Sequence, residues 1–387
     1  MSLPKTWRAW SKQSGSKTGP AGTAHPGPYR MKCIFKNKRI SSIITVVPSE
    51  EYRFDDEYPL YKMTETQAKR FKKMMSLDRH RIAPPEVCAS DLCLFGVQRL
   101  LDGGVLKKED IDAILFISQT PDYILPATSN VIHGKLGLDH DVICLDMNQG
   151  CAGYLTGLQQ ACLLLEIPAV SKVLLLTGDT SSKLVDRRNR ISYPITGDAG
   201  AATVIERCPE EKTIYMDVKN DGSRYKALVI PGGAYRMPSS AETLELREVE
   251  EGVIKCLEHA DMDGAAIFNF TMDDVPPQIQ DVLSFSGDTW DSIEHFFLHQ
   301  PNPFIVTQMA QKMKIPPAKV PNNVVSLYGN CASVTIPLNI ALNCSEPMLT
   351  GTHRVCLSGF GVGLTWISAV LDMGPLDFCK LVDYKAT

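Results

Sequence analysis

Cys151 lies in a segment whose residue types favour a reactive thiol. Residues 146–154 read DMNQGCAGY, with Gly150 directly before the cysteine and Gly153 two residues after it. Glycines at these positions permit a tight turn between a strand and a helix. A cysteine at the start of a helix meets the helix dipole and free backbone N–H groups, which stabilise the thiolate. Because the thiolate is the reactive form, we predict that Cys151 is a nucleophile.

The other eleven cysteines favour a different interpretation. They are scattered, form no CxxC pair and mostly lie within apolar runs. This pattern is typical of free buried thiols in a reducing compartment, and not of a disulfide framework or a zinc site. We therefore predict a cytoplasmic protein without metal ligands. A buried structural thiol is also the alternative for Cys151, but the flanking glycines favour the nucleophile.

The composition excludes several classes of function. The 387 residues carry a net charge of −4, with 44% hydrophobic and 22% charged residues, which is typical of a globular protein with a large core. This charge is not typical of a nucleic-acid-binding protein. No apolar stretch of about 18 residues predicts a transmembrane helix. Residues 1–30 are rich in Gly, Pro, Ser, Thr and Lys, so we predict a disordered extension or an artefact upstream of a start at Met31.

Three short apolar runs recur at a constant spacing of 182 residues (293 − 111 = 182). The matched pairs are 111–116 with 293–298, 142–145 with 324–327, and 172–175 with 354–357. Each run has the length of a buried strand, and helix-like stretches follow the second run in each half, at 156–165 and 336–342. The repeat therefore predicts an α/β protein with two duplicated halves, residues 31–207 and 212–387, packed as a pseudo-dimer.

Polar side chains follow the matched strands, where α/β units bind their ligands. These residues are Asp146, Asn148, Cys151, His299, Gln300 and Asn330. Two halves that face each other would bring them into one central cavity. The alternative for His299 is a buried core histidine, and for Asn330 a turn former after Gly329. Asn148 occupies the position equivalent to Asn330 (148 + 182 = 330), and we predict that it is structural.

Several motifs of this chain together resemble the β-ketoacyl-acyl-carrier-protein synthase III family. Cys151-Ala152-Gly153-Tyr154 resembles the nucleophile motif, and His299-Gln300-Pro301-Asn302 resembles the HQxN motif. Residues 328–337 are similar to the GN…S..IP motif, and residues 197–202 and 359–366 to two glycine-rich turns. The matches keep the family order from about residue 79 to residue 368. This resemblance implies a thiolase-like fold, layered αβαβα.

The resemblance also implies a reaction and a site. Cys151, His299 and Asn330 would be the catalytic triad of a decarboxylative Claisen condensation. Cys151 would take an acyl group from a thioester, and His299 and Asn330 would stabilise the enolate formed when a malonyl group loses carbon dioxide. The backbone N–H groups of Cys151 and Val362 would form the oxyanion hole. The implied substrates are thioesters of acyl carrier protein or coenzyme A in lipid metabolism, with no cofactor.

Some positions depart from the family pattern. Arg70 and Met74 replace a Trp and an Arg that hold the adenine of coenzyme A, whereas Arg190 matches a position that contacts the nucleotide. Phe304 replaces a basic residue that helps to dock the carrier protein. We therefore predict a divergent member of the family. Its primer would arrive on a dedicated carrier protein or as an unusual acyl group.

The remaining substrate-binding candidates come from loops. Residues 120–126 resemble the dimer-interface loop of the family, in which Leu125 would cap the acyl pocket of the partner, so a homodimer is expected. The alternative is an ordinary proline-containing loop without a role in dimer formation. Gly361 and Gly363 belong to the turn that would border the thioester. Phe304 would line or flank the acyl pocket.

Two other functions compete with condensation. The acyl group on Cys151 would pass to an oxygen or nitrogen nucleophile, or the chain would be a non-catalytic partner of an active enzyme. The presence of both His299 and Asn330 favours condensation, because simple acyl transfer forms no enolate that needs stabilisation. A non-catalytic subunit usually lacks the cysteine or the histidine, and this chain has both.

Overall fold

The structure, a computed structural model, describes residues 32–385, so the predicted extension at residues 1–30 lies outside the described part. The chain forms two large sheets. The six-stranded sheet has the order β17 (Phe378–Asp383), β2 (Lys38–Val47), β8 (Asp198–Arg207), β7 (Lys172–Thr180), β5 (Ala113–Ile117), β6 (Ile143–Met147). The five-stranded sheet has the order β1 (Lys32–Lys36), β9 (Thr213–Asn220), β16 (Thr365–Met373), β15 (His353–Gly361), β14 (His295–Leu298).

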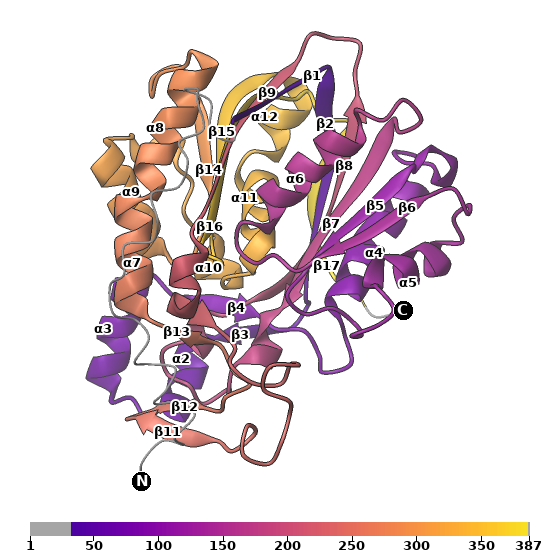
Figure 1. The fold of residues 1–387 in the computed structure, drawn as a ribbon. Coiled ribbons are helices and arrows are strands. Elements are labelled where there is room, and N and C mark those ends of the chain that lie inside the picture. Colours follow the sequence, from indigo (N-terminus) through magenta and orange to yellow (C-terminus); the bar gives the residue numbers. More distant parts are fainter. Residues whose placement is uncertain (1–31, 386–387) are drawn as a thin grey trace, which may run out of the picture.

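Helices form three layers around these sheets (Figure 1). α6 (Gly153–Leu164) and α11 (Thr335–Asn343) lie between the sheets, where their apolar side chains share one core with both of them. α4 (Ala89–Asp102) and α5 (Thr128–Leu136) cover the outer face of the six-stranded sheet. The outer face of the other sheet is covered by α7 (Gly264–Asp273), α8 (Val275–Ser286) and α9 (Pro303–Met313). The predicted αβαβα layering is therefore confirmed.

The duplication is visible in the element boundaries. β5 and β14 begin 182 residues apart (295 − 113), and so do α6 and α11 (335 − 153). One matched pair was predicted wrongly, because residues 143–145 belong to strand β6 whereas the run at 324–327 lies in helix α10 (Val324–Tyr328). A short apolar run has too few residues to show a helical or a strand period. The Val324 N–H binds the side-chain oxygen of Gln300 at 2.9 Å, which starts a helix there.

The two sheets exchange strands at the ends of the chain. β1 pairs antiparallel with β9 in the five-stranded sheet, and β17 pairs parallel with β2 in the six-stranded sheet. Each sheet thus contains one strand from the opposite end of the sequence. The division at residues 31–207 and 212–387 describes the internal repeat and remains a prediction for folding units.

Two insertions lie together at one end of the molecule (Figure 1). The first contains β3 (Glu51–Arg53), α2 (Phe54–Glu57), α3 (Glu65–Met75) and β4 (Arg79–Arg81). The second contains β10 (Leu228–Val229), β11 (Arg247–Glu250), β12 (Val253–Lys255) and β13 (Asp261–Met262). A hydrogen bond from the Asp78 N–H to the Ser326 carbonyl links the first insertion to α10.

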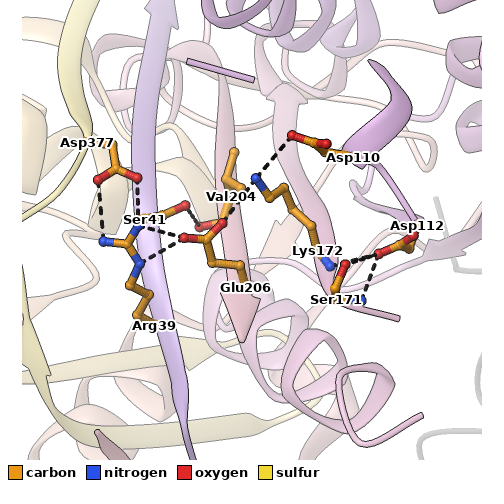
Figure 2. Close-up of polar contacts among 9 residues, drawn as sticks. All are labelled: Arg39, Ser41, Asp110, Asp112, Ser171, Lys172, Val204, Glu206 and Asp377. Atoms are coloured by element: carbon orange, nitrogen blue, oxygen red, sulfur yellow. Dashed lines mark hydrogen bonds and ion pairs between the residues drawn. The ribbon is translucent and has the colours of Figure 1, made fainter. Parts of the chain in front are cut away.

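Charged side chains tie the opposite end of the six-stranded sheet together (Figure 2). Arg39 on β2 binds Glu206 and Asp377, each at 2.7 Å, and Lys172 on β7 binds Glu206 at 3.2 Å. Asp112 accepts hydrogen bonds from the N–H and hydroxyl groups of Ser171. This network lies at the amino ends of β5 and β7. The polar residues of the candidate site lie at the carboxyl ends of the strands, so the role of the network is structural. Between residues 32 and 385, no helix has the length and hydropathy needed to cross a membrane.

Candidate active site

The turn that carries Cys151 connects β6 to α6, and its glycines are required by the surroundings. A Cβ atom on Gly150 would lie 2.2 Å from the side-chain oxygen of Gln119, and one on Gly153 would lie 2.8 Å from Ile117. Cys151 itself precedes α6 by two residues and is half-buried. The predicted strand–turn–helix junction is therefore confirmed.

The turn after β15 closes over the sulfur from the other half of the chain. A Cβ atom on Gly361 would lie 2.7 Å from the Cβ and 3.1 Å from the sulfur of Cys151. The backbone N–H groups of Cys151 and Val362 both act to lower the pKa of the thiol. Gln149 donates a hydrogen bond of 3.3 Å to the Val362 carbonyl, which orients this peptide. Two N–H groups thus converge where an oxyanion on an acyl-cysteine would form.

The protonation state of Cys151 differs from the prediction. Burial, with the carboxyl group of Asp179 nearby, raises the pKa of the Cys151 thiol to about 12. The two N–H groups lower this pKa, as predicted, but desolvation is the larger effect. The resting nucleophile is therefore a neutral thiol at neutral pH, and its proton must leave as the sulfur attacks.

His299 lies at the carboxyl end of β14 and is buried. Its backbone N–H donates to the Ser358 carbonyl at 2.8 Å, and its ring makes an edge contact with Phe360. The ring Nδ1 is 2.7 Å from the hydroxyl of Thr335, which leaves Nε2 as the free nitrogen. Burial lowers the pKa of His299 to about 3, so the imidazole is neutral.

Asn330 follows α10 and is held by both its backbone and its side chain. Its N–H donates to the Ile195 carbonyl at 2.7 Å, and its carbonyl accepts from the Gly197 N–H at 3.2 Å. Its side-chain oxygen accepts a hydrogen bond of 3.0 Å from the Ala332 N–H. Because the oxygen is occupied, the NH₂ group is the end that remains available to a substrate.

Shared neighbours bring the three predicted triad residues to one place. Along β15, Ser358 and Phe360 contact His299, whereas Gly359 and Gly361 lie against residues 151–152. The segment after Asn330 makes the second connection. Its Ala332 carbonyl accepts a 3.1 Å hydrogen bond from Thr335, whose hydroxyl also contacts His299, and a Cβ atom on Gly153 would lie 3.0 Å from Ser333.

Other polar residues predicted at the strand ends have structural roles. Asp146 accepts hydrogen bonds from the N–H groups of Thr128 and Ser129 and so caps α5. The Gln300 side chain binds the backbone of Pro321 and Val324. Asn148 is exposed, in contrast to Asn330.

The substrate-binding candidates are spread over several surfaces. Arg190 borders a cavity of about 320 Å³ that is also lined by Met63, Gln67, Arg70, Phe71, Met74 and Ile191. Phe304 stacks on Phe268 and is 42% exposed. Leu125 is 79% exposed and lies remote from any described core. Gly363 has a φ of 137°, a conformation that favours glycine.

Two buried residues at the site were missed by the sequence analysis. The Thr335 hydroxyl contacts His299. The Asp179 carboxyl group accepts a 2.7 Å hydrogen bond from the Gln119 N–H and is close enough to Cys151 to raise the pKa of its thiol. Burial raises the pKa of Asp179 to about 7. Asp179 is the penultimate residue of β7, the third matched strand, so the rule that selected Asp146 would also have found it. Thr335 lies inside the 328–337 motif, but nothing in its position indicated a contact with a histidine.

Comparisons with known proteins agree with this geometry. Residues 145–222 match the family described as 3-Oxoacyl-[acyl-carrier-protein (ACP)] synthase III, and residues 283–373 match its C-terminal part. A Campylobacter jejuni protein named for this family is 33% identical over 349 residues, which cover 89% of this chain and 97% of the relative. A Streptococcus mutans β-ketoacyl-[acyl-carrier-protein] synthase III is 30% identical over 336 residues, covering 86% of this chain and 98% of the relative.

A solved structure supports the same conclusion. The 3-oxoacyl-(acyl-carrier protein) synthase of Burkholderia xenovorans superposes with a TM-score of 0.85 at 33% identity, over 91% of this chain and 99% of that chain. The fold is thus thiolase-like, as predicted, and the similarity extends over nearly the whole described chain. This chain therefore belongs to the 3-oxoacyl-[acyl-carrier-protein] synthase III family of enzymes.

Proposed function

We propose that this enzyme joins an acyl primer, carried on Cys151, to a malonyl thioester by decarboxylative Claisen condensation. The observation that carries the proposal is the presence of two separate groups of donors. The N–H groups of Cys151 and Val362 surround the sulfur, and the amide of Asn330 and the Nε2 of His299 form a second pair. A reaction with an oxyanion on the acyl-cysteine and a separate enolate needs both pairs.

In the first half-reaction, the Cys151 sulfur attacks the carbonyl carbon of a primer thioester. Because the thiol is neutral at rest, its proton passes to the departing thiolate of the carrier as the carbon–sulfur bonds exchange. The tetrahedral oxyanion accepts hydrogen bonds from the two backbone N–H groups. Collapse of this intermediate leaves the acyl group on Cys151 and releases the free carrier thiol.

In the second half-reaction, the malonyl thioester loses its carboxyl group as carbon dioxide. The electron pair of the broken carbon–carbon bond forms an enolate, whose oxygen accepts hydrogen bonds from the Asn330 NH₂ and from His299. The Thr335 hydroxyl lies 3.1 Å from the Ala332 carbonyl oxygen and 2.7 Å from Nδ1 of His299, so its single proton can go to either acceptor. When this proton turns to Nδ1, Nε2 carries the ring proton that the enolate oxygen accepts. The enolate carbon then attacks the acyl-cysteine, and the Cys151 sulfur leaves and regains a proton.

We propose that the acyl primer and the malonyl group arrive as thioesters of acyl carrier protein, of coenzyme A, or of both. The cavity beside Arg190 and Arg70 supports an anionic donor, because two guanidinium groups and apolar side chains line it. One terminal nitrogen atom of Arg190 is buried without a hydrogen-bond partner in the structure. The same nitrogen lies 3.7 Å from a Glu251 carboxylate oxygen, a distance longer than a hydrogen bond, so Arg190 keeps donors that a phosphate oxygen would accept.

We also propose a homodimer. β6 is an edge strand of its sheet and exposes Leu145, and the loop after β5 exposes Tyr123, Ile124 and Leu125. Apolar side chains beside an open strand edge support pairing with a second copy of the chain.

The function is tested with a malonyl thioester labelled at its free carboxyl group and a panel of primer thioesters. Labelled carbon dioxide and a 3-oxoacyl product are expected, and Cys151→Ala should abolish the product. Intact mass spectrometry should show an acyl adduct on Cys151 before the malonyl thioester is added. Loading of Cys151 followed by transfer to water, an alcohol or an amine without release of carbon dioxide would contradict the proposal.

A further inference from the structure

A buried pair of ionisable side chains lies behind Asn330, outside the two donor pairs. His80 on β4 and Glu57 at the end of α2 are 2% and 4% exposed. The His80 Nε2 is 2.8 Å from a carboxyl oxygen of Glu57. Its Nδ1 is 2.7 Å from the carbonyl oxygen of Thr196. Burying a histidine and a carboxylate costs free energy unless each is fully hydrogen-bonded, so this arrangement calls for a physical reason.

The hydrogen-bond partners define the protonation state of the pair. The Thr196 carbonyl only accepts, so Nδ1 of His80 carries a proton. The Glu57 carboxyl group accepts a hydrogen bond from the Tyr61 hydroxyl at 3.0 Å and an ion pair from Arg187 at 3.3 Å. Burial acts to raise the pKa of Glu57, but these donors and His80 lower it overall. A single proton therefore lies between Nε2 of His80 and the Glu57 carboxyl group, so both ring nitrogens of His80 are hydrogen-bonded.

The Thr196 carbonyl belongs to the segment that holds Asn330. Residues 195–197 bind both backbone polar groups of Asn330. Thr196 and Asn330 form a parallel bridge between two otherwise separate segments. The backbones are so close that a Cβ atom on Gly329 would lie 2.4 Å from the Thr196 carbonyl oxygen. A movement of this carbonyl thus moves Asn330, because no side chain separates them.

The β4 segment also holds the other side of the Asn330 turn. Asp78, two residues before His80, donates its N–H to the Ser326 carbonyl in α10 at 3.1 Å. Arg81, the residue after His80, lies over the ring of Tyr328 at 5.9 Å. The three contacts make β4 a brace across both segments that define the position of Asn330.

We propose that His80, hydrogen-bonded between Glu57 and the Thr196 carbonyl, is a positioning residue that places the Asn330 amide for decarboxylation of the malonyl thioester. This inference rests on the proposed condensation, in which Asn330 binds the enolate oxygen. It goes beyond that function because His80 acts only through residues 195–197. Acylation of Cys151, which needs no enolate, should therefore be independent of His80.

The test separates the two half-reactions in His80→Gln. The glutamine cannot make both ring hydrogen bonds at once, so the link between Glu57 and the Thr196 carbonyl is lost. Release of carbon dioxide from the malonyl thioester should fall about 10- to 100-fold in kcat, as expected for a misplacement of about 1 Å, with little change in KM. Acyl loading of Cys151, measured by rapid-quench mass spectrometry, should stay within about threefold of the wild-type rate. The control His140→Gln changes an exposed histidine and should affect neither step.

A double-mutant cycle distinguishes positioning from a general loss of structure. In the Asn330→Ala background, His80→Gln should cause no further loss of decarboxylation, because the group that it positions is absent. Equal losses in both half-reactions, or additive losses in the double variant, would refute the proposal. If His80→Gln does not fold, Glu57→Gln provides a milder change with the same expected split. Failure of the wild-type protein to release carbon dioxide would instead contradict the proposed function.

Discussion

Replacement of Gly361 by alanine tests the close approach between the two halves of the chain. The new Cβ atom would lie 2.7 Å from the Cβ of Cys151, whereas carbon atoms in contact prefer about 3.5–4.0 Å. The two atoms must therefore separate by about 1 Å. Gly361 is buried at the end of β15, where it pairs with Thr365, so the strand resists movement. The Cys151 turn should move instead.

Two magnitudes follow from this displacement. Overpacking of a buried site costs about 1–3 kcal/mol in the free energy of unfolding. A shift of about 1 Å between the sulfur and its N–H donors should reduce the rate of acyl loading about 100-fold. The two losses are of similar size, because a 100-fold rate loss corresponds to about 2.7 kcal/mol. A domain with a free energy of unfolding of about 5–15 kcal/mol stays folded for the assay.

The measurement is the rate of acyl-Cys151 formation by rapid quench and intact mass, together with denaturant unfolding at 25 °C. Gly264→Ala is the matched control, because a Cβ atom at this exposed glycine meets nothing within 4 Å. It should leave acyl loading unchanged. A Gly361→Ala protein that loads Cys151 within about threefold of the wild-type rate would show that the closeness of the two turns does not orient the sulfur.

Three further outcomes are expected. Thr335→Val removes the hydroxyl that lies 2.7 Å from Nδ1 of His299 and can donate to it, so the Nε2–H form loses its support and decarboxylation should fall about 100-fold. Thr335→Ser keeps the hydroxyl and should retain the rate. The pKa of Asp179 in the folded state is about 7, above its ordinary value of 3.8, so between these pH values the folded state binds a proton that the unfolded state has lost. The free energy of unfolding should therefore fall by up to about 4 kcal/mol as the pH rises from 4 to 8. Denaturant titrations should show a flatter pH profile for Asp179→Asn. Leu145→Arg places a charge on the exposed edge strand and should yield a monomer by light scattering; an unchanged dimer would exclude β6 from the interface.

Local sequence patterns predicted much of the fold and site. The glycines around Cys151 indicated a turn, and α6 begins at Gly153, directly after it. The repeat of 182 residues predicted that β5 and β14 are equivalent and that their carboxyl ends face one site. These predictions succeeded because a turn and a short buried strand depend mainly on neighbouring residues. The helix at 324–328 was mistaken for a strand because its start depends on Gln300, a residue 24 positions away.

The amino-acid sequence alone predicted which sulfur, imidazole and amide form the candidate site. Their chemical states depended on contacts between distant segments. The Cys151 thiol is neutral because β15 and Asp179 enclose it, and the free NH₂ of Asn330 follows from one hydrogen bond made by Ala332. The exchange of β1 and β17 between sheets likewise joins opposite ends of the chain. Desolvation and long-range strand pairing are properties of the packed molecule, because they depend on which distant segments come into contact and which groups they bury from solvent.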